Sequence, residues 1–218
     1  MSTPHQAQLI NWALSAPRMA TYEQAIVAEA DYLPVAALEL YDWNAQVSGA
    51  FMAPLHICEV VMRNAVSDAL TAVYGARWPW STVFETSLPA PSSGYDPRRD
   101  LQRNRAAHPT TGKVIPELKF VFWQKMFTSR YDGRLWSPHL LRVLPNLDPA
   151  KTVAQLRGEI YVDLEHVRLL RNRIAHHEPI FKRQLRDDLN RVTDLIRFRC
   201  ATTATWMMGA QWVTQYFR

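Results

Sequence analysis

The sequence predicts an all-α protein. Only seven glycines occur in 218 residues, and no alternating hydrophobic run is flanked by the Asn-Gly or Asp-Gly turns that join β-strands. Apolar residues instead recur at steps of three and four along several segments, which is the helical period. Hydrophobic residues make up 48% of the chain, which is enough for a substantial core, and the length suits one domain. We therefore expect a single helical domain over residues 1–218.

The N-terminal part predicts two short helices followed by a long one. The expected helices lie at about 4–15, 20–30 and 34–74. A proline suits the first turn of the long helix, and Gly75 suits its end. Gly49 or Pro54 is expected to kink or divide it.

Residues 76–112 are expected to form a largely irregular loop. Four prolines and a Ser-Ser-Gly sequence fall within residues 77–97, and such residues favour turns over regular structure. A short basic helix at about 97–107 fits inside this segment.

The C-terminal half predicts a further series of helices. An aromatic-rich helix is expected at 114–127, a turn at 130–136, a short helix at 137–145, a long helix at 151–177, another at about 182–207 and a last one at 209–217. The long helix has the strongest pattern, with apolar residues at Val153, Leu156, Ile160, Leu164, Val167 and Leu170. Pro179 ends it, because a residue before proline avoids the helical region.

Charge is distributed unevenly along the chain. The formal net charge is +5, which moderately favours an anionic partner. Residues 1–60 contain one basic residue, Arg18, against six acidic ones, whereas residues 97–142 contain ten basic residues against three acidic ones. This split suits a basic face that holds phosphates, although ordinary surface charge is the simpler interpretation.

Neither the cysteines nor the chain ends indicate export. Cys58 and Cys200 have no CxxC partner, and Cys58 lies in an apolar helical pattern typical of a core residue. The N-terminus lacks the basic and apolar regions of a signal peptide. The longest uncharged run, 200–217, contains four threonines, two glutamines and a glycine, which favour a buried or interfacial helix over a membrane span. We expect a soluble cytoplasmic protein without a cofactor.

Two near-copies of one basic sequence are the candidate functional motifs. RNRAAHP at 103–109 has little apolar support on either side, so we interpret it as a mobile basic turn that contacts phosphates non-specifically. RNRIAHHEP at 171–179 ends the strongest amphipathic helix. Asn172 and His176 share a face there, and the long side chain of Arg171 can reach the same place. A histidine that transfers protons beside a permanent planar cation is the minimum set for RNA cleavage without metal.

The sequence LRNRIAHHEPIF resembles the signature of the Abi-like (abortive-infection) proteins of the HEPN superfamily, which are all-α ribonucleases. The family motif is R-x4–6-H with a polar residue after the arginine, which Arg171, Asn172 and His176 match. Residues 39–66 with 74–78 look like the family's N-terminal helix pair, and residues 112–136 look like its middle segment. The resemblance therefore extends over most of 35–185.

The resemblance implies a HEPN-like helical bundle, here with additional N-terminal helices, and a homodimer that brings two R-x4-H motifs together. It implies RNA as substrate and a role in phage defence or as a toxin, with an antitoxin protein or a small RNA as a further partner. The expected products carry a 2′,3′-cyclic phosphate and a 5′-hydroxyl. Arg171 would stabilise the transition state, His176 would transfer the proton and Asn172 would orient the site. The alternative is a non-catalytic module of the same fold that binds RNA or a partner.

Further residues are expected to support this site. The doubled His177 could stand behind His176 or contact RNA, and Glu59, Arg63 and Asn64 could hold the motif in position, although an i,i+4 salt bridge between Glu59 and Arg63 is the simpler interpretation. The expected RNA-binding residues are Arg98, Arg99, Arg103, Arg105, Lys113 and Arg173.

Other sequence features argue against different kinds of site. Some HEPN toxins carry a modified tyrosine two positions after the histidine, where this chain has Glu178. A metal site at 176–178 is disfavoured, because adjacent side chains diverge and neither HExxH nor CxxC spacing accompanies them. The chain has no glycine-rich phosphate loop, and its Trp-rich segments suit a core or dimer interface better than base stacking. The apolar face near 153–170 is a candidate dimer interface.

Overall fold

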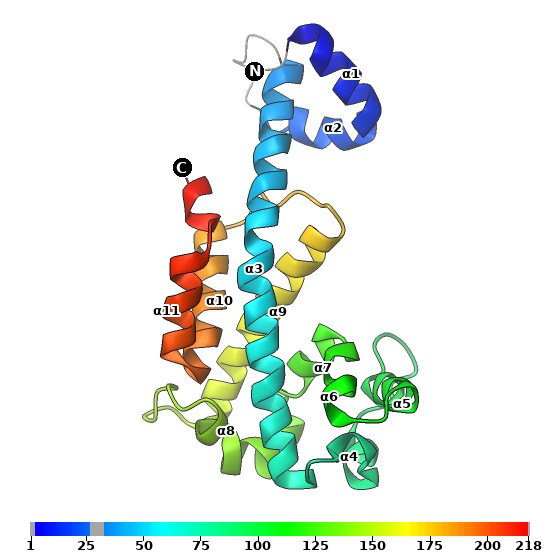
Figure 1. The fold of residues 1–218 in the computed structure, drawn as a ribbon, viewed down its shortest axis with the longest axis vertical. Helices are drawn as coiled ribbons and strands as arrows, with labels where there is room; N and C mark the ends of the chain where they lie inside the picture. Colours follow the sequence, from blue (N-terminus) through cyan, green and yellow to red (C-terminus); the bar gives the residue numbers. More distant parts are fainter. Residues whose placement is uncertain (1–2, 27–32, 218) are drawn as a thin grey trace.

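The computed structural model describes residues 3–26 and 33–217, which form eleven α-helices and no β-strand. The helices are α1 (Pro4–Leu14), α2 (Ala16–Glu23), α3 (Leu33–Tyr74), α4 (Thr82–Ser87), α5 (Pro97–Ala107), α6 (Thr111–Val114), α7 (Phe120–Lys125), α8 (Ser137–Val143), α9 (Val153–Ala175), α10 (Leu185–Arg199) and α11 (Ala201–Ala210). The all-α prediction is confirmed. Figure 1 shows an elongated molecule built along α3, with α1 and α2 at one end and α4–α8 at the other.

Helix α3 is a continuous helix of 42 residues and forms the axis of the fold. Neither Gly49 nor Pro54 divides it, so that prediction of a division is wrong. Pro54 is buried inside the helix, which continues past it although proline cannot donate the usual backbone hydrogen bond. By length and hydropathy alone α3 could cross a membrane, but here its apolar residues pack against α2, α8, α9 and α10.

Helix α9 runs back along α3 and carries the candidate motif at its end (Figure 1). Its first residue follows Thr152, whose side chain accepts from the Gln155 N–H while Gln155 reaches back to Thr152, a capping box. The apolar stripe of α9 faces the core; its buried members are Leu156, Ile160, Leu164, Val167, Leu170 and Ile174. Because this stripe is buried within one chain, the candidate dimer interface near 153–170 is not free, and that prediction is corrected.

The helix expected at 182–207 is two helices. Cys200 lies between α10 and α11 in an extended conformation, with φ −154° and ψ 110°. The uncharged segment after residue 200 therefore forms the short α11, which packs along α10.

The segment 76–112 is more structured than expected, because it contains α4 and α5 and the start of α6. The short helix at 97–107 is confirmed as α5. Short helices form here despite the prolines, because bulky side chains provide a core. Trp78, Phe84 and Phe122 are fully buried against one another. The helix expected at 114–127 is interrupted at Pro116 and Leu118, so only α7 remains of it. The tryptophan-rich segments thus contribute to the hydrophobic core. The region formed by α4–α7 is called the basic lobe below.

Helices α1 and α2 form a pair with its own small core. Ala7, Met19, Tyr22, Ala37 and Leu38 are buried together, apart from the main cluster. The pair packs against the first half of α3, near the end of α9. It therefore adds a wall beside the candidate motif.

Candidate functional site

The end of α9 is closed by a Schellman motif. The Glu178 N–H donates to the Arg173 carbonyl at 2.7 Å, and the His177 N–H donates to the Ile174 carbonyl at 3.0 Å. His176 is the last residue before the left-handed position, which His177 occupies with φ +56°. Glycine usually fills that position, so the sequence places a histidine where the backbone is strained.

The three predicted catalytic residues lie in the last turns of α9 and at its C-cap, His176. Arg171 and His176 are exposed and Asn172 is half-buried. Within the described part of the chain, none of these three side chains has a hydrogen-bond or ion-pair partner. Asn172 and His176 are four residues apart on one helical face, while Arg171 and His176 are about 7–8 Å apart along the helix axis. No contact within the described residues holds Arg171 and His176 in a fixed geometry relative to each other.

His177 faces a different direction from His176. It lines two neighbouring cavities that lie against α1, α2 and α3, whereas His176 is in the wall of neither. The His177 carbonyl accepts a hydrogen bond of 2.8 Å from Nη1 of Arg18 on α2. This geometry favours His176 over His177 as the partner of Asn172.

Two contacts of buried residues fix the chain that follows α9. Asn44 on α3 accepts the Ile180 N–H through its Oδ1 at 2.7 Å, and Asn44 is only 5% exposed. Arg183 forms a bidentate pair with buried Asp188, with bonds of 2.6 and 2.8 Å. Because charge-assisted bidentate pairs are among the stronger hydrogen bonds, the end of α9 is well anchored on its core side.

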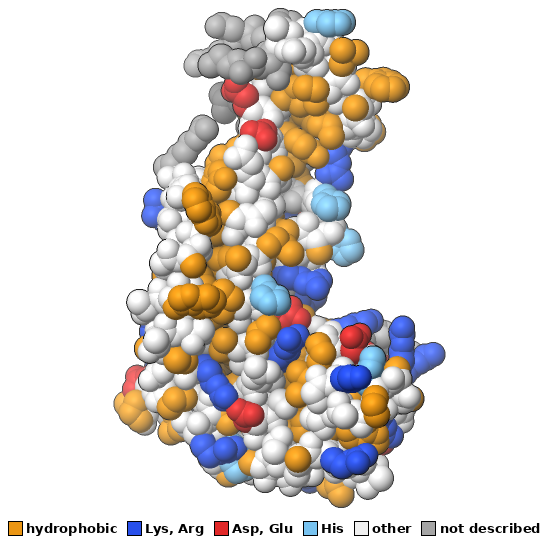
Figure 2. All heavy atoms as spheres, in the orientation of Figure 1, with side chains coloured by type: hydrophobic (Ala, Val, Ile, Leu, Met, Phe, Trp, Pro, Cys, Tyr) orange, Lys and Arg blue, Asp and Glu red, His pale blue; other side chains and the backbone are white. Residues whose placement is uncertain are grey.

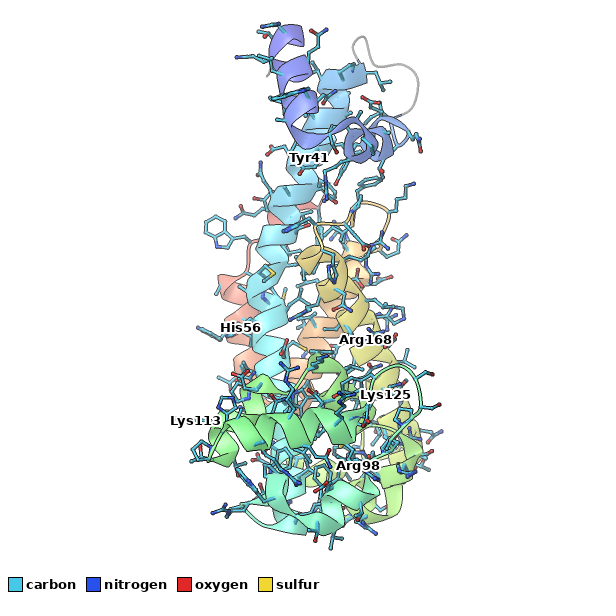
Figure 3. All side chains as sticks on the ribbon, turned by 90° about the vertical axis from the view of Figure 1, so that its right-hand side faces the viewer. Tyr41, His56, Arg98, Lys113, Lys125 and Arg168 are labelled. Carbon is cyan, nitrogen blue, oxygen red and sulfur yellow. The ribbon has the colours of Figure 1, made fainter. Side chains whose placement is uncertain are left out.

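A charged network continues the same face of α9 toward the basic lobe. Glu165 accepts two hydrogen bonds from Arg168 and one from the buried amide of Gln124 on α7, at 2.6 to 2.9 Å. The hydrogen bonds from Arg168 lower the pKa of the Glu165 carboxyl most, and the bond from Gln124 lowers it further. Lys125 donates to the Tyr161 hydroxyl at 2.9 Å. Arg168 and Lys125 lie on the side seen in Figure 3, below the end of α9.

The predicted RNA-binding residues fall into two groups. Arg98 donates to the carbonyls of Thr86 and Leu88, and Arg105 pairs with Glu85 at 2.5 Å, so both hold α4 against α5. Arg173 donates to the Pro179 carbonyl at 3.1 Å and lies 3.7 Å from Glu178, so it secures the turn after α9. The exposed members that remain for a ligand are Arg99, Arg103 and Lys113.

The residues proposed to support the motif from α3 lie elsewhere on that helix. The α3 residues at the cavity beside the end of α9 lie between Tyr41 and Met52, so Glu59 is about two helical turns further along. Within the described residues no ion pair joins Glu59 to Arg63, and Nε of Arg63 is buried without a partner. Asn64 is exposed. The structure thus brings none of the three to the end of α9.

The first copy of the motif also ends a helix, but its C-cap residue His108 is extended, with φ −132° and ψ 130°. His108 is the C-cap of α5 and donates its N–H to the Asn104 carbonyl, as His176 does to Asn172 in α9. The side chain of Asn104 bonds Asp100 and the Glu117 carbonyl, both at 3.2 Å. The copy is therefore an ordered helix end rather than a turn, and its asparagine is occupied by structural contacts.

The surface around the motif is hollowed. Figure 2 shows a concave side between the end of α9 and the basic lobe, where Lys, Arg and His side chains gather on both walls. The sequence did not point to Arg18 and Asn44, which contact this region from α2 and α3. Their role depends on long-range packing, and the only signal for Arg18 was that it is the one basic residue in the first sixty.

Comparison with protein-family models, with curated proteins and with solved structures found no match for this chain.

Proposed function

We propose that this protein is an endoribonuclease of the abortive-infection or toxin type, with a HEPN-like bundle, that cleaves RNA without a metal ion. The observation that carries this proposal is the set Arg171, Asn172 and His176 at the end of α9, whose side chains have no partner within the described chain and of which Arg171 and His176 are exposed. The hollowed basic side supports it, because a nucleic-acid backbone needs such a surface. The resemblance of the motif to the R-x4-H signature supports it independently.

The proposed reaction is an internal phosphoryl transfer. The 2′-oxygen of the RNA attacks the adjacent phosphorus and loses its proton, while the bond from phosphorus to the 5′-oxygen breaks and that oxygen gains a proton. His176 transfers one of these protons, and a second His176 from another copy of the chain would transfer the other. Arg171 stabilises the extra negative charge on the phosphorus oxygens, and Asn172 orients the substrate. The products carry a 2′,3′-cyclic phosphate and a 5′-hydroxyl.

The proposed surroundings of this activity follow from the same resemblance. We propose a cytoplasmic homodimer whose partners are RNA and an antitoxin protein or small RNA. Arg99, Arg103 and Lys113 are the exposed cations that would hold the RNA backbone, since Arg98, Arg105 and Arg173 are engaged in contacts within the chain.

One observation favours a second function, a non-catalytic module that binds RNA or a protein partner in phage defence. No contact within the described chain fixes Arg171 against His176, and catalysis depends on such preorganisation. A binder needs only the exposed charges.

The test is an RNA cleavage assay in EDTA with analysis of the new ends. We expect Arg171→Ala and His176→Ala each to lower the cleavage rate by about 10²-fold or more, the usual loss when a proton-transfer or charge-stabilising group is removed. His108→Ala is the matched control, because His108 caps α5 as His176 caps α9, and it should cleave like the native protein. RNA that is bound but never cut, or equal cleavage by all four proteins, rejects the catalytic assignment in favour of the binding module.

A further inference from the structure

A cavity of about 600 Å³ lies between the α1–α2 pair, the first half of α3 and the end of α9. It adjoins the candidate motif through Ile174, Ala175 and His177. Tyr41, labelled in Figure 3, stands on α3 beside the N-terminal pair and lines it. Its volume falls in the range of roughly 300–1,000 Å³ that small-molecule sites occupy.

Most of the wall is apolar and includes two aromatic rings. Leu14, Met52 and Ile174 supply aliphatic surface. Tyr22 and Tyr41 meet edge to face with their ring centroids 5.0 Å apart. Such a wall suits a flat aromatic ligand, which gains both apolar burial and ring contacts.

The interior also offers a directed hydrogen-bond donor. Because Oδ1 of Asn44 accepts from the Ile180 N–H, the NH₂ group of Asn44 points the other way. That group has no hydrogen-bond partner among the described residues, although Asn44 is only 5% exposed and lines the cavity. Buried polar side chains are normally paired, so the NH₂ group of Asn44 without a partner indicates that the cavity receives a polar ligand.

Cationic groups stand at one side of the cavity. Arg18 lines both this cavity and a second one of about 370 Å³, and it uses one of its five N–H donors on the His177 carbonyl. His177 lines both cavities as well. The remaining donors of the guanidinium suit an anionic group such as a phosphate.

Backbone strain marks the same place. Among the described residues, Ser15 and His177 are the non-glycine residues with positive φ, at +75° and +56°. Both line the second cavity, on either side of Arg18. Strained residues of this kind tend to cluster at functional sites.

We propose that this cavity is a nucleotide-binding site. The base lies against Tyr41 and Met52 and accepts a hydrogen bond from the Asn44 NH₂ group. The phosphate lies on Arg18 and the ring of His177. The nucleotide is either a free nucleoside monophosphate or the unit of an RNA chain next to the phosphate held by Arg171 and His176. Only the second source depends on the proposed ribonuclease function.

The experiment is calorimetric titration of the full chain with AMP, GMP, CMP and UMP, and with inorganic phosphate alone. We expect saturable binding of at least one nucleotide and at least tenfold weaker binding of phosphate. Gly49→Leu is the blocking variant, because a Cβ at Gly49 meets nothing within 4 Å and the added side chain stands at the cavity wall. We expect it to weaken nucleotide binding at least tenfold.

Gly158→Leu is the matched control. Gly158 is also inside a long helix, a Cβ there also meets nothing within 4 Å, and it lies outside the cavity. It should bind nucleotides like the native protein. If no nucleotide binds, if phosphate binds as tightly as the nucleotides, or if Gly49→Leu binds as the native protein does, the proposed site is rejected.

A second measurement separates the two sources and keeps the two proposals apart. Cleavage of poly(A), poly(G), poly(C) and poly(U) is compared for the native protein and Gly49→Leu. A changed base preference supports an RNA unit in the cavity, whereas nucleotide binding with unchanged preference supports a free nucleotide. Arg171→Ala should still bind nucleotides, since Arg171 does not line the cavity. If the native protein binds nucleotides but cleaves no RNA, the proposed ribonuclease function is rejected and the proposed nucleotide-binding site is retained.

Discussion

His177 adopts a backbone conformation that glycine adopts more readily. Its φ of +56° brings Cβ close to the next carbonyl, which costs an L-residue about 1–2 kcal/mol. We predict that His177→Gly raises the free energy of unfolding, by about 1 kcal/mol once the greater freedom of glycine in the unfolded chain is counted. Urea denaturation measures this change.

His176→Gly is the control for that substitution. His176 has φ −95°, a value at which glycine has no steric advantage, so its replacement should not stabilise the protein. A His177→Gly protein that is less stable than the native one would show that the imidazole makes a compensating contact.

Asn44 is the residue on which the anchoring of the turn after α9 depends most directly. Replacing it with leucine leaves the Ile180 N–H buried without an acceptor, which costs about 1–3 kcal/mol. We predict a loss of this size in the free energy of unfolding for Asn44→Leu. Asn64→Leu on the same helix should change it by less than about 0.5 kcal/mol, because Asn64 is exposed. Equal effects of the two substitutions would contradict the anchoring role.

At the level of single residues, the sequence allowed predictions about neighbours along one helix but not about contacts between residues far apart in the chain. Asn172 and His176 were predicted to share a helical face from their spacing alone, and Arg171 was expected to reach the same place through its long side chain. The contacts of Arg18 and Asn44 with the chain after α9 join residues 159 and 136 positions apart, and no local pattern encodes them. The prediction that Glu59 supports the motif came from the family resemblance and not from spacing. The structure places Glu59 about two helical turns beyond the α3 residues that lie beside the end of α9.

At the level of elements, the link between α7 and α9 depends on ionisation. The pKa of Glu165 is lowered in the folded protein, so its contribution to stability is present above its unfolded pKa and is lost as pH falls through its folded pKa. Glu165→Ala also leaves the fully buried Gln124 amide without its acceptor. We predict a loss of about 1–3 kcal/mol at pH 7 that becomes smaller at pH 3.

The control for the pH effect is Glu159→Ala on the same helix. Glu159 pairs with Lys151 where both side chains are well exposed, at 50% and 42%, and such surface pairs contribute little. Denaturation curves at both pH values should show almost no change for this variant. A loss for Glu165→Ala that stays the same between pH 7 and pH 3 would reject the role of its charge.

Helices with a strong apolar period could be predicted from the sequence, whereas the positions at which other helices are interrupted could not. The pattern over 153–170 predicted α9 within two residues at each end. The break at Cys200 and the loss of the first half of the helix expected at 114–127 depend on how neighbouring elements pack, which a periodic pattern does not contain. In the segment 76–112, buried aromatic residues formed short helices where prolines suggested a loop.

At the level of the whole molecule, the two hydrophobic clusters are very unequal. The cluster under the α1–α2 pair contains five buried residues, whereas the main cluster spans α3 to α11. A segment with few buried apolar contacts opens at a lower free energy than the rest. We predict that backbone amides of α1 and α2 exchange with solvent faster than those of α10, as measured by native-state hydrogen exchange. Uniform exchange across all three helices would show that the chain opens as one unit.

The same experiment connects stability to the cavity, because the α1–α2 pair forms one of its walls. A ligand that binds only the closed state stabilises it by RT ln(1 + [L]/Kd), so a nucleotide at a hundredfold its Kd adds about 2.7 kcal/mol to the cost of opening. We predict that exchange of the α1 and α2 amides then slows by about a hundredfold while that of α10 changes less. Gly49→Leu should abolish this protection, and Gly158→Leu should retain it. Protection that survives in Gly49→Leu would place the nucleotide elsewhere on the molecule.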